Sequence, residues 1–269
     1  MAGIPLSSRH ELVLALILVV GAVGCAGGGP KTPTAAELAG TNAKVVVVAP
    51  LNVASALPIE IEGSSEIVAT TLVAYLEEHG KTVRKLGFRG GRDLWVAATR
   101  QVDQSGQRKT FENAASVYAR EIAKHVEYDV LIVPTLYIQN AQVRSRFVRW
   151  DGTRELVRIE GRRVLSKRRT IFDSMHAGMR AASMMAAVFA ADGTVLQTGN
   201  RGLQAIEHVQ LSDGKGVDRD ESFFSIEPNS PPLDDPVKIR AGIAAALSPF
   251  LPELAPVEET IEARGGGTE

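Results

Sequence analysis

The chain has 269 residues, 45% of them hydrophobic and 23% charged, with a formal net charge of -1. This composition excludes general disorder and predicts a packed core, which the low aromatic content of 5% makes mainly aliphatic. The small net charge says nothing about partners. A single cysteine leaves no intramolecular disulfide, so the fold must be stabilised by packing alone.

The only cysteine, Cys25, follows a short apolar run. Residues 12–20 are apolar, Arg9 precedes them, and small residues and three glycines come after them. The run is shorter than the roughly 20 residues of a membrane span, and its flanks are those of a signal peptide. Residues 22–24 before Cys25 resemble a bacterial lipobox. This resemblance implies removal of residues 1–24 and acylation of Cys25; an ordinary cleaved signal peptide is the alternative.

The residue after Cys25 predicts the cellular location of the protein. Ala26 stands where an Asp would resemble an inner-membrane retention signal, so we expect the outer membrane, periplasmic face. A lipoprotein cysteine of this kind carries more than one acyl chain, and two hydrophobic signals suffice for stable anchoring. Palmitate on Cys25 would therefore hold the protein at the membrane.

Three regions follow the signal peptide. Residues 25–43 contain three consecutive glycines and two prolines, which predict a lipidated cysteine and a flexible tether. Residues 44–252 form one periplasmic domain, and residues 253–269 form a disordered tail.

The first half of the domain alternates strands and helices. The β-branched run 45–48 predicts a buried strand, and residues 81–86 predict a short one. Between them, Ser64 and Ser65 begin a helix that Gly80 ends. We expect one face of that helix to be buried, namely Val68, Leu72, Tyr75 and Leu76.

Two helical pieces come next, after a break at residues 87–91. One spans residues 93–104, and the other begins near Thr110 with apolar residues at helical spacing. Residues 129–139 predict a strand that Pro134 interrupts, which indicates a bulge or an edge position beyond it.

The second half is rich in hairpins. Asp151-Gly152 and Asp192-Gly193 predict two-residue type I′ turns, which pair residues 143–150 with 153–164 and residues 182–191 with 194–206. Residues 211–232 predict a polar loop. A last helix begins with Asp235 as N-cap and Pro236 at its first position, and it stops before residue 249.

The order of elements predicts an α/β fold: a mixed sheet of about five to seven strands, with hairpins in its second half, flanked by three to four helices. The run 45–50, the helix end at Gly80, the strand entry at 128–130, the hairpin at 191–194 and the closing helix at 244–247 resemble a group of envelope proteins. That group includes the curli-secretion lipoprotein, the lipoprotein activators of penicillin-binding proteins and the N-terminal domain of the Tol-Pal propeller protein. The resemblance implies the fold of residues 44–252 and leaves function open.

Motifs for catalysis, cofactors or metals are missing from the sequence. No Gly-x-Ser-x-Gly elbow occurs, residues 87–92 lack the ending of a phosphate loop, and the acidic loop 213–221 lacks calcium-ligand spacing. The adjacent carboxylates at 77–78 and 234–235 fit a helix face and a helix cap. The histidines are scattered without zinc-ligand spacing: His79, His125, His176 and His208. We therefore predict no catalytic, cofactor-binding or metal-binding residue.

A basic segment is the most informative surface feature. Residues 144–169 hold ten Arg or Lys and three acidic residues. With a two-residue turn at Asp151-Gly152, Arg149 faces Arg154, and like charges opposite one another are destabilising. The predicted binding hairpin comprises Arg144, Arg146, Arg149, Arg154, Arg158, Arg162 and Arg163.

Two interpretations of this hairpin stay open. It docks onto an acidic partner protein, lipopolysaccharide phosphate or an acidic wall polymer, or it is a charged edge that blocks aggregation. Nucleic acid is disfavoured by the compartment. A pore is disfavoured because each Arg on a lipid face costs about 2 to 4 kcal/mol at the bilayer centre.

The main hypothesis is a non-enzymatic lipoprotein that acts as scaffold, assembly factor or regulator of an envelope machine by protein binding. Two alternatives are a wall-polymer hydrolase whose carboxylates are assembled by the fold, and a structural oligomer of a secretion assembly.

Overall fold

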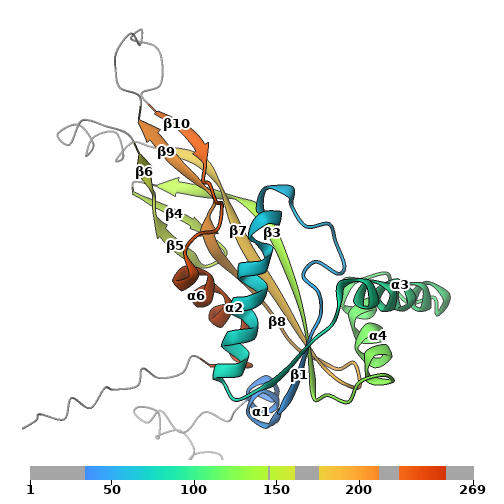
Figure 1. Cartoon of the computed structure of the whole chain (residues 1–269). Coiled ribbons are helices and arrows are strands. Elements are labelled where there is room, and N and C mark those ends of the chain that lie inside the picture. Colours follow the sequence, from blue (N-terminus) through green and yellow to red (C-terminus); the bar gives the residue numbers. More distant parts are fainter. Residues whose placement is uncertain (1–33, 145, 161–175, 212–223, 253–269) are drawn as a thin grey trace, which may run out of the picture. The chain divides into compact units, whose positions relative to one another are not determined.

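The computed structural model describes residues 34–144, 146–160, 176–211 and 224–252 (Figure 1). Within these ranges it contains five α-helices and one 3₁₀ helix: α1 Ala35–Asn42, η1 Ile59–Ser64, α2 Ser65–Glu78, α3 Phe88–Gln104, α4 Phe111–Ala123 and α6 Pro236–Leu247. The larger sheet has seven strands: β1 Val45–Val48, β2 Thr82–Lys85, β3 Val130–Arg144, β4 Phe147–Trp150, β5 Thr153–Leu156, β7 His176–Ala190 and β8 Val195–Ala205. A smaller sheet has three: β6 Ile159–Glu160, β9 Glu207–Leu211 and β10 Phe224–Pro228. The predicted α/β fold is confirmed.

The long strand β3 organises the larger sheet. On one edge it pairs with the parallel strand β1 at Val130–Ile132 and, at its far end, with the antiparallel strand β4 at Gln142–Arg144. On the other edge it pairs with β7 along its whole length, and β7 pairs with β8. The β4–β5 hairpin therefore lies at the opposite end of β3 from β1 (Figure 1).

Two helical layers cover the β1 end of the sheet. Alternate residues of a strand point to opposite faces, so Ile132 packs in a core with α2 and α6 while Leu131 packs in a core with α3 and α4. Full burial of each such aliphatic side chain contributes about 1.5 to 3 kcal/mol. A third cluster lies under the β4–β5 hairpin and includes Val148 and Trp150.

Two helices follow their local signals closely. The four buried residues of α2 are the four predicted, and Gly80 adopts the left-handed conformation (φ 72°) after it. In α6 the Asp235 carboxylate accepts hydrogen bonds from the N–H groups of Val237 and Lys238. None of the described helices is long and apolar enough to cross a membrane.

The predicted tether is wrong for its last part, because α1 lies within it. Thr34 and Glu37 form a capping box at its start. Gly40 packs so closely that an added Cβ would lie 1.6 Å from the carbonyl oxygen of Phe250. Residues 1–33, with Cys25, and the predicted tail 253–269 lie outside the described residues.

The predicted break at residues 87–91 is also wrong, because α3 begins there. Gly87 is the N-cap and Gly91 is buried within the helix. A Cβ on Gly91 would lie 2.7 Å from Cγ of Pro50, so close helix packing explains this glycine better than a turn.

Of the bulge and the edge position predicted at Pro134, the structure shows an edge position. The strand β3 continues to Arg144 and does not end at residue 139 as predicted. The β1 pairing stops at Ile132, and the Pro134 carbonyl accepts from the Asn52 N–H at 3.1 Å. The nitrogen and the carbonyl of a strand residue point to the same side, so the nitrogen of Pro134 faces away from β7. The missing N–H group of the proline therefore removes no hydrogen bond between β3 and β7.

The second predicted hairpin pairs as expected, but its turn differs. The Ala190 N–H donates to the Thr194 carbonyl, and of the Asp-Gly pair only Gly193 has positive φ (87°). The loop therefore has three residues and is not a two-residue type I′ turn. The predicted loop 211–232 is wrong where β10 pairs with β9, and residues 212–223 lie outside the described ranges.

Candidate anion-binding face

The turn of the basic hairpin has the predicted geometry. Asp151 (φ 37°) and Gly152 (φ 68°) are both left-handed, as a type I′ turn requires. Trp150 pairs with Thr153, and Arg149 lies directly opposite Arg154.

The inner side of this hairpin is fixed by packing. Val148 is fully buried, and Trp150 is 5% exposed and donates its indole N–H to the Ala182 carbonyl at 3.1 Å. The indole fits against Gly202 of β8, where an added Cβ would lie 2.3 Å from its nitrogen. Because alternate side chains point to opposite faces, this packing directs the intervening residues to solvent.

The outward residues form what we call the arginine face: Arg144, Phe147, Arg149, Arg154 and Leu156. All three arginines are exposed, and none has an acidic partner among the described residues. The Arg154 guanidinium lies 3.5 Å from the centroid of the Phe147 ring. Leu156 is 63% exposed beside them. The face thus combines guanidinium groups that no described carboxylate neutralises with apolar surface.

The other predicted arginines differ in their surroundings. Arg146 is exposed at the turn between β3 and β4 and has no ion pair with a described residue. Arg158 is neutralised by Glu160 at 3.0 Å and Asp234 at 3.2 Å, so it does not belong to the arginine face. Arg162 and Arg163 lie outside the described residues.

The opposition of Arg149 and Arg154 is costly. The Val157 N–H donates to the Arg146 carbonyl at 2.9 Å, which continues the bonding alternation that starts at the two-residue turn. Arg149 and Arg154 therefore form a non-hydrogen-bonded pair, in which Cα atoms are only about 4.5 Å apart. Like charges so placed destabilise the sheet. An anion bound between the two guanidinium groups would remove that repulsion.

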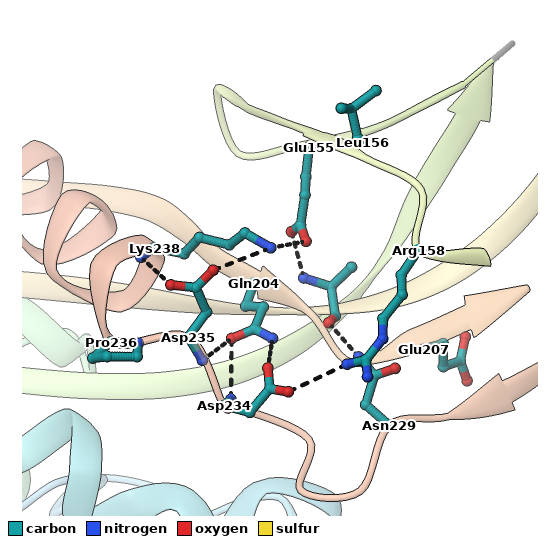
Figure 2. Close-up of a pocket in the computed structure, with 11 residues that line it drawn as sticks. Glu155, Leu156, Arg158, Gln204, Glu207, Asn229, Asp234, Asp235, Pro236 and Lys238 are labelled. Atoms are coloured by element: carbon teal, nitrogen blue, oxygen red, sulfur yellow. Dashed lines mark hydrogen bonds and ion pairs between the residues drawn. The ribbon is translucent and has the colours of Figure 1, made fainter. Parts of the chain in front are cut away.

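A groove of about 430 Å³ lies beside the hairpin, between β5, β8 and the start of α6 (Figure 2). Its carboxylates are engaged by neighbours. Glu155 accepts from Lys238 Nζ at 2.7 Å and from the Ala205 N–H at 2.9 Å. A hydrogen bond from Gln204 and the guanidinium of Arg158 lower the pKa of Asp234.

This groove contains several carboxylates, as the active site of a glycosidase does, but they are not arranged for that reaction. A glycosidase needs one carboxyl with a raised pKa to protonate the leaving group. Asp234 is shifted the other way, and Asp235 caps α6. The groove is better explained as a polar joint that ties β5 to β8 and α6 (Figure 2).

The histidines do not come together either. His79 contacts the carbonyl oxygens of Tyr75 at 2.7 Å and Pro252 at 3.2 Å, and His208 contacts the Asn229 side chain. No group of three or more His, Cys, Asp or Glu residues in the described ranges is placed to hold a metal ion. The acidic loop 213–221 lies outside those ranges.

The predicted hairpin of residues 143–150 and 153–164 is too long, because Arg144 lies on β3 and residues 159–160 pair with β9. Sequence reasoning also missed the apolar part of the arginine face. Phe147 and Leu156 could have been found from the same register, since they lie opposite one another on the outward side. Neither a protein-family model nor a characterised protein matches the sequence.

Proposed function

We propose that this protein is a non-enzymatic lipoprotein of the bacterial outer membrane, anchored through Cys25 on the periplasmic side. It acts as scaffold, assembly factor or regulator of an envelope machine by binding an acidic partner protein. The observation that carries the binding proposal is the arginine face, where Arg144, Arg149 and Arg154 are exposed without a described acidic neighbour.

The chemistry of the face supports an anionic partner. A guanidinium group offers a planar fork of donors that matches a carboxylate with two parallel hydrogen bonds. Leu156 and Phe147 add apolar contact area next to Arg154. Protein interfaces are enriched in Arg and aromatic residues, and the arginine face presents both kinds next to an exposed Leu.

Photocrosslinking in intact cells tests the proposal. A photoreactive side chain replaces Gln142, an exposed and uncharged residue that pairs with Arg149 and lies on the same side of the sheet, so that no arginine is lost. A matched control replaces Gln101, which is exposed on α3. We expect a heterologous protein adduct from position 142 alone, and we expect Arg149→Glu to abolish it.

Three results would contradict the proposal. Equal adducts from both positions would indicate nonspecific capture. An adduct that survives charge reversal would show that the arginines are a solvated edge. Adducts with the protein itself alone would favour the structural oligomer instead.

A further inference from the structure

The outer edge of β5 carries backbone groups that have no partner among the residues that the structure describes. β5 is the terminal strand in the order β2-β1-β3-β4-β5. Arg154 and Leu156 occupy non-hydrogen-bonded pairs with β4, so their N–H and C=O groups point away from β4. No hydrogen bond to these groups comes from any residue in the described ranges.

A depression of about 530 Å³ follows this edge, lined by Phe147, Arg154, Glu155, Leu156 and Lys238. Figure 2 shows Leu156 pointing away from the network in which Glu155 takes part. One side of the edge is thus occupied by internal ion pairs, and the other presents Arg154 and an exposed Leu.

We infer that an extended segment of an acidic partner protein adds to the outer edge of β5 as a further strand. On the outward side, one of its carboxylates lies against Arg154, and an apolar residue two positions away lies against Leu156. The backbone of the segment bonds the N–H and C=O groups of both residues. This inference rests on the proposed function, because it uses the same face.

A peptide strand suits this edge better than a polyanion does. Unpaired donors and acceptors alternate along it, and only another backbone matches both at strand spacing. Alternate side chains of an added strand point to one face, which fits an acid and an apolar residue two positions apart. A phosphate or carboxylate polymer would use the guanidinium groups and leave the edge unpaired.

Replacement of one edge donor separates strand addition from charge attraction. The N–H of Leu156 points outward, so Leu156→Pro removes it without breaking a bond to β4 and leaves every charge in place. Leu156→Ala is the matched control, which shortens the side chain and keeps the N–H group.

The probe is a synthetic eight-residue peptide in which Glu and Leu alternate at every second position, with Thr between them. Its control is the same peptide N-methylated on alternate residues along the edge that faces β5. Binding to the soluble mature chain is followed by fluorescence anisotropy. We expect saturable binding, weakened about tenfold or more by N-methylation or by Leu156→Pro, and less by Leu156→Ala.

The inference is overturned if the N-methylated peptide binds as tightly, if Leu156→Pro leaves affinity unchanged, or if binding does not saturate below about 1 mM. If Arg149→Gln weakens both peptides equally, the proposed anionic recognition stands and strand addition fails. If sedimentation shows that copies of this chain associate and Leu156→Pro separates them, a second copy occupies the edge and the inference is wrong. Failure of the proposed function appears separately, as loss of position-specific photocrosslinks.

Discussion

Replacement of Arg149 by Gln should stabilise the protein while it weakens binding. Arg149 and Arg154 lie opposite one another in a non-hydrogen-bonded pair on the outward side of the hairpin. Relief of such like-charge opposition contributes about 0.2 to 1 kcal/mol. For a domain of this size, 1 kcal/mol corresponds to roughly 2 to 4 °C in Tm, so we expect the Tm of Arg149→Gln to rise by about 0.4 to 4 °C.

Arg154→Gln provides the matched comparison. It relieves the same repulsion but also removes the guanidinium that lies 3.5 Å from the Phe147 ring centroid. An exposed cation–π contact contributes about 0.5 to 1 kcal/mol, so the two effects nearly cancel. The two variants should therefore differ in stability although each removes one positive charge.

Urea unfolding of both variants at 0.1 M and 1 M salt provides the assay. The Debye length falls from about 10 Å to about 3 Å over this range, so the gain from Arg149→Gln should shrink at high salt. A lower free energy of unfolding for Arg149→Gln, or a gain that does not depend on salt, would refute repulsion between Arg149 and Arg154 as a cost to stability. A stability gain together with a weaker crosslink would mark a surface kept for binding at a cost in stability.

Three other predictions concern the fold. Gly202→Ala places a methyl group 2.3 Å from the buried indole nitrogen of Trp150 and should lower the free energy of unfolding in urea by about 1 to 3 kcal/mol. In the control Gly178→Ala the new methyl group meets nothing within 4 Å, so stability should change by less than about 0.5 kcal/mol. Equal losses would contradict close packing of Gly202 against Trp150. Asn52→Ala removes two 2.8 Å hydrogen bonds to the backbone of Leu136 and puts alanine in a left-handed conformation (φ 56°) that Asn tolerates better. We expect the free energy of unfolding to fall by about 2 to 4 kcal/mol, and a loss below about 1 kcal/mol would contradict this role of Asn52. Hydrogen bonds from the backbone N–H groups of Val45 and Lys44 lower the pKa of Asp129 from its usual 3.8. The ionised carboxylate therefore stabilises the fold above about pH 4, and this stabilisation is lost as the pH falls through the lowered pKa of the folded state. Between pH 7 and pH 3 the wild type should lose more stability than Asp129→Asn, and equal losses would rule out this carboxylate as a cause.

Elements with strong local signals were predictable. In α2 and α6 the cap residues, the stop signals and the spacing of apolar residues agree, so local sequence and tertiary packing favour the same helix. The helix α1 also had a local signal, the capping box of Thr34 and Glu37, but the glycines and prolines before it indicated a tether.

Other features depend on contacts between distant residues. Arg158 is neutralised by its near neighbour Glu160 and by Asp234, which is 76 positions away, so a local count of charges could not include the second partner. The β9–β10 pair likewise joins segments separated by a polar stretch. In contrast, the opposition of Arg149 and Arg154 was predictable because a two-residue turn fixes the register of its hairpin.

The proposed location at the outer membrane would determine which partners the arginine face can meet, and it depends on acylation of Cys25. Cells that produce the protein with an affinity tag after residue 269 are fed an alkyne-bearing fatty acid, and the purified product is probed for label. We predict label and membrane fractionation for the wild type and loss of both for Cys25→Ser. An unlabelled wild-type protein, or a labelled Cys25→Ser variant, would contradict the assignment as a lipoprotein.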